Sequence, residues 1–267
     1  MSDLSANLGR SPDGEAHLTL LGSARDVDDA ELARLYAYPP ARSGRSTWVR
    51  ANFISSIDGA AAVAGRSGGL AGPGDRNLFG LQRALADVIV VGAGTVRVEN
   101  YGGAQLHPAQ RQHRRELGQT EVPQLAIVTR SGHLDTDLRV FTQTELPPMV
   151  LTCTAAADET RGRLGGLAEV VDCSDGNPDR VDEEAVLAAL SDRGRHRILT
   201  EGGPSLLGSF IERDLLDELC LTVAPYLVGG QAPRIAAGAA AMRTPMRCAH
   251  LLTDETGYLY ARYVRGV

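Results

Sequence analysis

A glutamate, two glycines, a proline and a serine stand in a row at residues 201–205, and this run is suited to bind an anion. The apolar segment before it, residues 197–199, predicts a short buried strand, and the segment after it predicts a helix ending at Glu212. The first N–H groups of a helix lack partners within the helix and carry about half a positive charge, and glycines let phosphate oxygens approach the backbone. Alone, the run is equally typical of an ordinary strand-to-helix turn.

Two more predicted strands end in groups of the same kind. Residues 92–95, Gly-Ala-Gly-Thr, follow one apolar run, and Arg130 and Ser131 follow another. A guanidinium beside a hydroxyl suits a phosphate monoester, such as the 2′-phosphate that distinguishes NADP from NAD. Ligands of open α/β sheets bind at the carboxyl ends of the strands, so the three strand ends together predict a dinucleotide groove. It is not of the Rossmann type, because no G-x-G-x-x-G run opens a first βαβ unit.

These strand ends need a sheet that brings them together, and the hydrophobic pattern predicts one. Strands alternate with helices for most of the length, and two antiparallel strands close the chain. This order predicts an α/β fold with a mixed, mostly parallel sheet in three layers (α/β/α) and a C-terminal hairpin. We expect one domain over residues 17–267 behind a flexible N-terminus of residues 1–16.

The predicted strands are 48–57, 86–91, 124–129, 149–152, 168–172, 197–199, 218–226, 250–253 and 257–264, with 60–64 as a partner or continuation of the first. The predicted helices are 27–38, 75–85 (capped by Asp75), 158–164, 182–193 and the helix after the glycines. Residues 101–120 show no periodicity and are expected to be a surface excursion.

Composition excludes several classes of function. The net charge of −6 argues against nucleic acid as the main partner. The chain has no lysine, and therefore neither a Schiff-base lysine nor a P-loop lysine. Its four cysteines are far apart and match no zinc or disulfide pattern, so we expect reduced thiols, no metal and a cytoplasmic location. We expect no signal peptide, and no membrane span, because no apolar stretch approaches roughly 20 residues.

Three blocks of the sequence, residues 56–59, 87–96 and 198–230, occur in the order and at the spacing of a known family. The chain resembles the reductase domain of bifunctional riboflavin-biosynthesis deaminase–reductases over roughly residues 47–265, and most closely the stand-alone actinobacterial pyrimidine reductases. The resemblance implies a dihydrofolate-reductase-like fold. It also implies NADPH-dependent reduction of 5-amino-6-(5-phosphoribosylamino)uracil to its ribitylamino product. The zinc signature of the deaminase half is absent, so neither deaminase nor zinc is expected.

The resemblance also implies roles for individual residues. Glu201 and Glu99 are the expected catalytic residues: the first would hydrogen-bond the pyrimidine edge, and the second would bind sugar hydroxyls or relay a proton. Arg83 would clamp the sugar phosphate. The expected substrate contacts are Asn52, Ser67, Arg83, Glu99 and Glu201. The expected NADPH contacts are Ser55, Gly92, Thr95, Arg130, Ser131, Gly202, Gly203, Pro204, Ser205 and Leu206.

The substrate side departs from the family pattern while the cofactor side keeps it. Asn52 replaces a lysine, Gly69 replaces a tryptophan, and Asn100-Tyr101 replaces Asp-Pro. A family arginine for the substrate phosphate has no counterpart in frame. A dihydrofolate or other pteridine reductase therefore remains an alternative, as does a nucleotide-binding protein without turnover. The resemblance further implies a homodimer.

Overall fold

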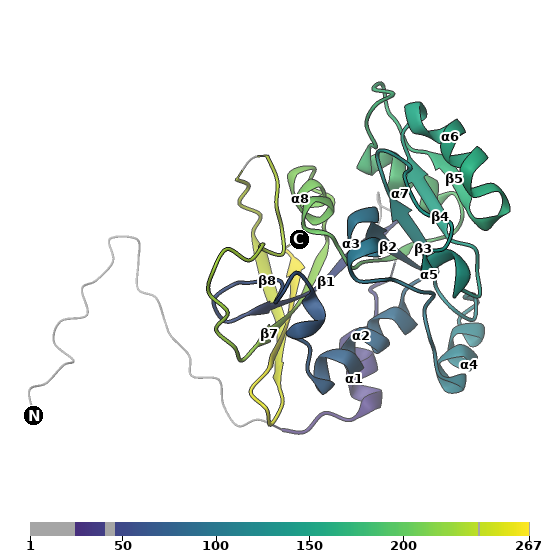
Figure 1. Ribbon diagram of the computed structural model, residues 1–267. Helices are drawn as coiled ribbons and strands as arrows, with labels where there is room; N and C mark the ends of the chain where they lie inside the picture. Colours follow the sequence, from purple (N-terminus) through teal and green to yellow (C-terminus); the bar gives the residue numbers. More distant parts are fainter. Residues whose placement is uncertain (1–24, 41–45, 240, 267) are drawn as a thin grey trace, which may run out of the picture. The chain divides into compact units, whose positions relative to one another are not determined.

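The computed structural model describes residues 25–40, 46–239 and 241–266 (Figure 1). The chain divides into two compact units, residues 1–36 and 37–267. In the first unit, helix α1 (Asp29–Leu35) is capped by Asp28, whose carboxylate accepts a hydrogen bond of 2.7 Å from Glu31 N. This helix is shorter than the predicted 27–38. The segment that we expect to be flexible, residues 1–16, lies outside the described residues.

The second unit is built on one sheet, whose strand order is β5-β4-β3-β2-β6-β1-β7-β9-β8 among the described residues. Every neighbouring pair from β5 to β7 is parallel, and β9 pairs antiparallel with both β7 and β8. This is the mixed, mostly parallel sheet with a closing hairpin that the sequence predicts. The strands are β1 (Trp48–Ser56), β2 (Val88–Gly92), β3 (Gln124–Val128), β4 (Met149–Thr152), β5 (Glu169–Asp172), β6 (Arg197–Thr200), β7 (Glu218–Ala224), β8 (Met246–Thr253) and β9 (Leu259–Arg265).

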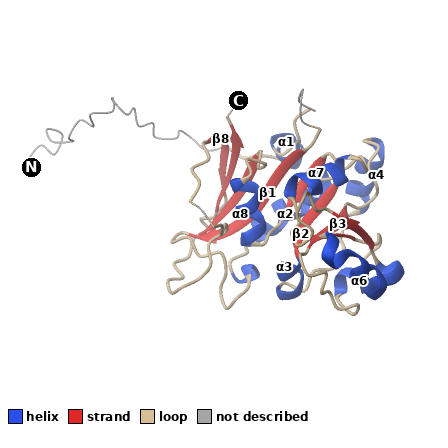
Figure 2. Ribbon diagram, turned by 90° about the horizontal axis from the view of Figure 1, so that it is seen from above, coloured by secondary structure: helices blue, strands red, loops and turns tan. Residues whose placement is uncertain are grey.

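Helices cover both faces of this sheet, as the predicted three-layer arrangement requires (Figure 2). On one face, Val88 and Val90 of β2 share an apolar core with helices α7 and α8. On the other face, Ile89 and Val91 pack with α3 and α5. The central strands are apolar on both faces because both faces are buried. The helices are α2 (Pro73–Leu85), α3 (Ala93–Val98), α4 (Pro108–Glu116), α5 (Arg139–Thr142), α6 (Thr154–Leu164), α7 (Glu183–Ser191) and α8 (Pro204–Glu212), with 3₁₀ turns at Ser67–Gly69 and Gly165–Leu167.

The sequence predictions for residues 60–64 and for Asp75 are wrong. Residues 60–64 form no strand: the segment makes only an isolated bridge between Val63 and Arg66. Asp75 does not cap α2, because Gly72 is the N-cap residue and Asp75 lies in the first turn. The carboxylate of Asp75 is thereby left available for contacts outside the helix backbone.

Helix α4 lies in the segment that was expected to be irregular. His107 and Gln110 form a capping box, and Pro108 occupies the first turn. The buried residue of this helix is Arg114, whose guanidinium donates hydrogen bonds to the carbonyls of Ala84, Ala86 and Thr120 at 2.9, 2.6 and 2.8 Å. The helix is held by a guanidinium rather than by apolar side chains, and hydrophobic periodicity therefore could not reveal it.

Among the described residues, no helix combines the length and the apolarity that a bilayer crossing requires.

Candidate active site

A cavity of about 1300 Å³ lies where β1, β2, β3 and β6 end, at the carboxyl edge of the parallel strands. It is the place where a ligand is expected in an open α/β sheet. All three predicted strand ends line it. The lining includes these predicted residues: Asn52, Ser67, Gly92, Thr95, Glu99, Arg130, Ser131, Glu201, Gly202, Gly203, Pro204, Ser205 and Leu206. Ser55, which is buried in β1, and Arg83 lie outside the lining.

The turn before α8 packs tightly against the end of β2. Gly92 N donates a hydrogen bond of 2.6 Å to the carbonyl of Gly202. Gly202 has a φ of +114°, a region that favours glycine, and the bond between Gly202 and Gly203 is cis. A Cβ atom on Gly203 would lie only 2.7 Å from Thr95 Oγ1, so this backbone approach requires glycine.

Helix α8 begins at the cavity without a side-chain cap. Gly203 is the N-cap residue and makes no side-chain hydrogen bond to the first turn, and Pro204 follows at the first helical position. The backbone N–H groups of Ser205 and Leu206 have no acceptor within the helix because of their position in its first turn. This end of the cavity can therefore offer backbone donors and a positive dipole to an anion.

The loop after β3 adds positive charge to the same cavity. Arg130 and Ser131 are exposed there. Arg97, which the sequence reasoning missed, also lines the cavity and donates a hydrogen bond of 3.1 Å to the carbonyl of His133 in this loop. Two guanidinium groups thus approach the region where the sequence predicts a phosphate monoester.

Glu201 is held by three donors. Arg83 donates from Nε and Nη2 to the two carboxylate oxygens, each at 2.7 Å, and the Tyr101 hydroxyl donates to Glu201 Oε2 at 2.9 Å. The guanidinium of Arg83 lies over the ring of Phe79, 4.1 Å from its centroid. Burial alone would lower the pKa of Arg83, but the charge of Glu201 and its hydrogen bonds raise that pKa above the usual value. Burial, followed by the charge of Glu201, raises the pKa of Tyr101.

This arrangement gives Arg83 a contact that the predicted role did not include. The resemblance suggested a clamp on a sugar phosphate, and that role stays a prediction; in the structure the guanidinium pairs with Glu201 and is not among the residues that line the cavity. A bidentate pair between a guanidinium and a carboxylate fixes the orientation of both groups. Arg83 and Tyr101 therefore orient Glu201, which does line the cavity.

The remaining predicted substrate residues occur in two pairs. Glu99 Oε1 accepts hydrogen bonds from the backbone N and the hydroxyl of Ser67, at 2.8 and 2.9 Å. Asn52 Oδ1 accepts one of 3.0 Å from Gln82 Nε2. The structure thus brings Ser67 and Glu99 together from distant parts of the chain, and it leaves Asn52 as a neutral group on the cavity wall.

Helix α2 contributes several side chains that the sequence reasoning did not assign to the site. Asp75, Arg76 and Phe79 line the cavity, and Arg83 continues the same face one turn further on. The spacing Asp75, Phe79, Arg83 follows the i, i+4, i+8 pattern of one helix face, a signal that was present in the sequence. Tyr101 had no such signal, because it reaches Glu201 from an irregular segment.

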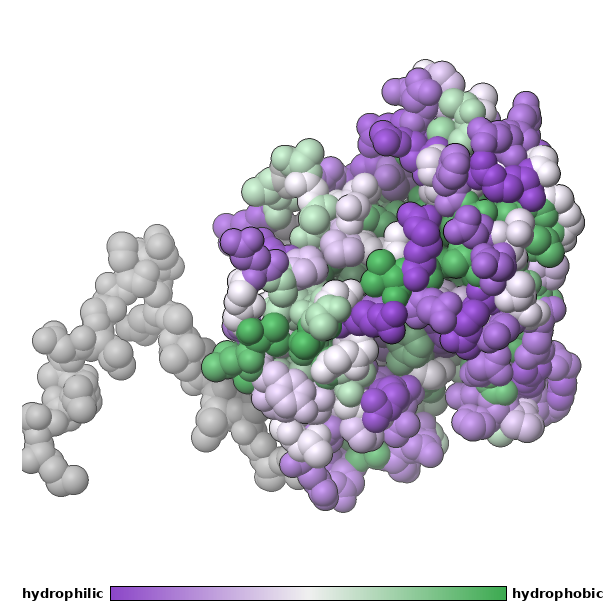
Figure 3. Space-filling model, in the orientation of Figure 1, coloured by the Kyte–Doolittle hydropathy of each residue, from purple (hydrophilic) through white to green (hydrophobic). Residues whose placement is uncertain are grey.

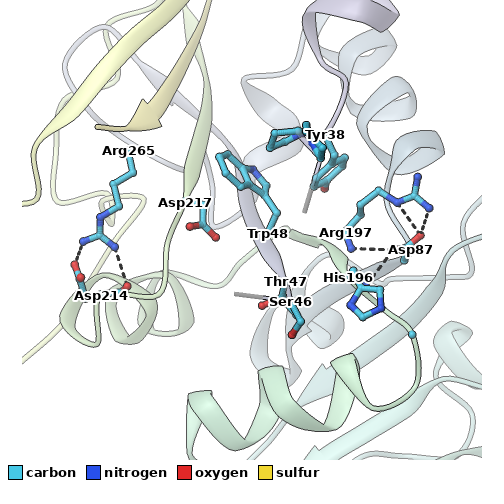
Figure 4. Close-up of a pocket in the computed structure, with 13 residues that line it drawn as sticks. Tyr38, Ser46, Thr47, Trp48, Asp87, His196, Arg197, Asp214, Asp217 and Arg265 are labelled. Atoms are coloured by element: carbon cyan, nitrogen blue, oxygen red, sulfur yellow. Dashed lines mark hydrogen bonds and ion pairs between the residues drawn. The ribbon is translucent and has the colours of Figure 1, made fainter. Parts of the chain in front are cut away.

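A second cavity, of about 760 Å³, lies at the opposite, amino edge of the same strands (Figure 4). Its charged side chains are paired with one another: Arg197 with Asp87 at 2.9 Å, and Arg265 with Asp214. Asp87 also accepts hydrogen bonds from the backbone N–H groups of His196 and Arg197. These pairs join charged side chains at this edge of the sheet and leave the first cavity as the better candidate for chemistry.

In the part of the chain that the structure describes, no three His, Cys, Asp or Glu side chains gather where they could hold a metal ion.

Comparison with known proteins shows what this chain is similar to. Residues 47–260 match the model of the RibD C-terminal domain. The chain is 28% identical over 187 residues to the 2,5-diamino-6-ribosylamino-4(3H)-pyrimidinone 5′-phosphate reductase of Methanothermobacter thermautotrophicus, covering 70% of this chain and 82% of that protein. It is 29% identical over 188 residues to the riboflavin biosynthesis protein RibD of Mycobacterium tuberculosis, and there spans only 43% of the relative's length.

Solved structures agree with the sequence comparison. A pyrimidine reductase-like protein from Corynebacterium diphtheriae superposes with a TM-score of 0.73 at 28% identity, covering 82% of this chain and 91% of that one. The riboflavin biosynthesis reductase Rib7 of Saccharomyces cerevisiae has the same fold, with a TM-score of 0.63 at 15% identity, covering 88% of this chain and 98% of that one.

Proposed function

This chain belongs to the RibD C-terminal domain family, and we propose that it reduces 5-amino-6-(5-phosphoribosylamino)uracil to the ribitylamino product with NADPH, in riboflavin biosynthesis. One observation carries the proposal: the same cavity is lined by an uncapped helix N-terminus, a basic loop and two oriented carboxylates, Glu99 and Glu201. The relatives named as pyrimidine reductases support the same substrate class.

The residues present fit a nicotinamide dinucleotide. The backbone of Gly203 passes so close to Thr95 that a side chain is excluded, and the first turn of α8 keeps donors for the pyrophosphate. Arg130 and Ser131, with Arg97 beside them, would hold the 2′-phosphate that distinguishes NADPH from NADH. When bound, NADPH supplies the hydride for the reduction.

The carboxylate of Glu201 is the proposed anchor for the pyrimidine. Its oxygens already accept from Arg83 and Tyr101, so the group faces the cavity in one orientation and can accept a further hydrogen bond from a ring N–H. Glu99, fixed by Ser67, would bind the hydroxyls of the sugar. These two groups position the substrate; neither is free to rotate away from the cavity.

The test is NADPH oxidation by the purified protein in the presence of the ribosylamino-uracil phosphate. We expect loss of the absorbance of the reduced nicotinamide together with formation of the ribitylamino product, and slower turnover with NADH. An Arg130→Ala variant should lose much of the preference for NADPH. Wild-type protein that binds NADPH and oxidises none of it with this substrate would contradict the proposal.

A second candidate function, reduction of dihydrofolate or another pteridine, is favoured by one specific observation. Arg83 is committed to Glu201, and Asn52 is neutral, so this region of the cavity offers less positive charge to a sugar phosphate than the family pattern suggests. A fused-ring substrate without a phosphate suits such a wall. Parallel assays with dihydrofolate distinguish the two candidates, and binding of NADPH without turnover of either would indicate a nucleotide-binding protein.

A cytoplasmic location and a homodimer are part of the proposal. The thiols of Cys153, Cys173 and Cys220 are buried and unpaired, which suits a reducing compartment.

A further inference from the structure

The cavity wall that we assign to the substrate is built from two short elements that follow each other in the chain. In the 3₁₀ turn Ser67–Gly69, Ser67 holds the carboxylate of Glu99, and the first turn of α2 places Asp75 on the wall. Neither element has a side-chain cap at its start. The position of the turn relative to the helix therefore depends on what holds the junction between them, residues 70–72.

One side chain from a distant part of the chain, Tyr258, contacts both ends of this junction. Tyr258 directly precedes β9 and is only 3% exposed. Its hydroxyl donates a hydrogen bond of 2.8 Å to the carbonyl of Leu70. Its ring lies against Gly72, the N-cap residue of α2, where a Cβ atom would be only 2.8 Å from Cε2 and Cζ of the ring. The ring thus occupies the space that a side chain at position 72 would need.

We propose that Tyr258 is a positioning residue for the substrate, because it fixes the junction and thereby the spacing between Glu99 and the first turn of α2. This inference rests on the proposed function. Tyr258 acts through the backbone. Leu70 N donates a hydrogen bond of 2.9 Å to the carbonyl of Ser67, and the carbonyl of Gly72 accepts one of 3.1 Å from the beginning of α2. A shift of either junction residue is therefore passed on to groups that line the cavity.

The ring of Tyr258 is itself held in place by the C-terminal hairpin. The ring of Tyr260 is nearly parallel to it, at 9° with centroids 6.2 Å apart, and Tyr226 meets it edge-on at 88° and 6.2 Å. Asp254, in the turn between β8 and β9, accepts hydrogen bonds from Tyr258 N at 3.2 Å and from the hydroxyl of Tyr260. Gly74 approaches this second ring so closely that a Cβ atom would overlap its hydroxyl oxygen. The hairpin therefore presents the Tyr258 hydroxyl to the junction in one orientation.

The groups proposed for NADPH lie away from this contact. They follow β2, β3 and β6, whereas Tyr258 precedes β9, and the strand order places β1 and β7 between β6 and β9. A change at Tyr258 should reach the substrate wall and leave the NADPH groups in place. The affinity for NADPH is therefore an internal reference for any change in substrate binding.

The first experiment compares the wild type with Tyr258→Phe, which keeps the ring and removes the donor to Leu70. It measures kcat and KM for the ribosylamino-uracil phosphate, and the affinity for NADPH by fluorescence without substrate. KM should rise about 5- to 10-fold, while kcat and the affinity for NADPH should stay within about twofold of the wild type, because one hydrogen bond that aligns substrate-binding groups is lost. Tyr263→Phe removes a hydroxyl from the same strand, β9, and is the control with unchanged kinetics.

A second experiment tests the contact between the ring and the helix start. Gly72 has a φ of −98°, which alanine can adopt, so Gly72→Ala adds only the Cβ atom that meets the ring. KM should rise in Gly72→Ala, and the same substitution should have much less effect in a Tyr258→Leu background, where the smaller side chain leaves room. Gly80→Ala adds the same atom to α2 at a place that is open among the described residues, and it serves as the control.

The outcomes separate the positioning role from the proposed function. An unchanged KM in Tyr258→Phe, with an active wild type, would overturn the positioning role and leave the proposed function intact. Purely additive effects of Gly72→Ala and Tyr258→Leu would also overturn it, as would a parallel loss of NADPH affinity and kcat, which indicates a general loss of structure. A wild type that binds NADPH and reduces no substrate would overturn both together.

Discussion

At the scale of single residues, the chemistry of this cavity depends on which donors each carboxylate meets. Glu201 meets a guanidinium and a phenol, Glu99 meets a serine, and Asp75 meets a threonine hydroxyl. Three carboxyl groups of similar intrinsic strength therefore stand in different surroundings at one cavity. Environment rather than residue type separates acids from hydrogen-bond acceptors in such sites.

The pair between Arg83 and Glu201 gives a prediction of stability. The side chain of Glu201 is only 1% exposed and that of Arg83 is 14% exposed. Arg83→Met should lower the free energy of unfolding by about 3–5 kcal/mol, because it leaves a buried carboxylate without its cation. Urea denaturation measures the loss. Arg161→Met removes an exposed arginine of α6 and should change stability by less than about 0.5 kcal/mol. Equal effects of the two substitutions would show that the buried pair contributes nothing beyond its surface counterpart.

Asp58 gives a prediction of pH dependence. Hydrogen bonds from the Ser56 hydroxyl and from the backbone of Gly229 and Val228 lower the pKa of Asp58 from 3.8 to about 2. Because the folded protein prefers the carboxylate, this contribution is present above pH 3.8 and is lost as the pH falls towards 2. Asp58→Asn should therefore be less stable than the wild type at neutral pH, and the difference in melting temperature should shrink over that window. A difference independent of pH would contradict the assignment.

At the scale of elements, α2 links two parts of the protein. Its first turns place Asp75 and Phe79 in the cavity, and its carboxyl end supplies the carbonyl of Ala84 to the guanidinium of Arg114 on α4. Helix α4, without an apolar stripe of its own, thus secures the far end of the helix that places Asp75 and Phe79 in the cavity. Helix α4 thereby positions α2, a role that the polar composition of its segment does not reveal.

The contact between α4 and α2 can be tested by Arg114→Met. The substitution removes the guanidinium donor from the carbonyls of Ala84, Ala86 and Thr120 and leaves Ala86 with only the 3.3 Å bond from Gln119 Nε2, so it should cost about 3 kcal/mol in the free energy of unfolding. The neighbouring Arg115→Met removes an exposed cation of the same helix and is the matched control. Protection of the α4 amides from hydrogen exchange should fall in the first variant and not in the second. Unaltered protection in both would rule out the guanidinium as the anchor of α4.

At the scale of the whole molecule, the proposed homodimer needs an apolar surface, and the loops after β1 and β7 provide one. Ile57 and Leu227 are 61% and 78% exposed, and Ile57 N donates to the carbonyl of Tyr226 at 3.0 Å, which joins the two loops. Figure 3 shows apolar side chains gathered on the side of the molecule that these loops occupy. Such patches on a protein surface mark interaction sites.

Light scattering after gel filtration tests the dimer. The wild type should have twice the chain mass of 28.3 kDa, and Leu227→Ser should shift the population towards the single chain. The control is Leu117→Ser, which also removes an exposed leucine, but at the C-terminal end of α4 and outside these two loops. This variant should keep the mass of the wild type. A wild type that elutes with the mass of one chain at all concentrations would contradict the dimer.

The sequence by itself determined the α/β architecture, because alternating apolar runs and helical periodicity report burial directly. The sequence also indicated the three strand ends that line the large cavity, since glycines and a basic turn at strand ends depend on local backbone geometry. Ser67 and Glu99, proposed from the resemblance, do contact each other.

Tertiary structure alone decided the partners of the charged groups. Arg83 pairs with Glu201, and Gly72 rather than Asp75 is the N-cap of α2. The first of these results depends on a contact between residues more than a hundred positions apart. Helix α4 was missed for another reason: its anchor is a guanidinium that binds carbonyls and leaves no periodic pattern. Backbone geometry and burial are local signals in a sequence, whereas the pairing of charges is settled only when the sheet brings distant segments together.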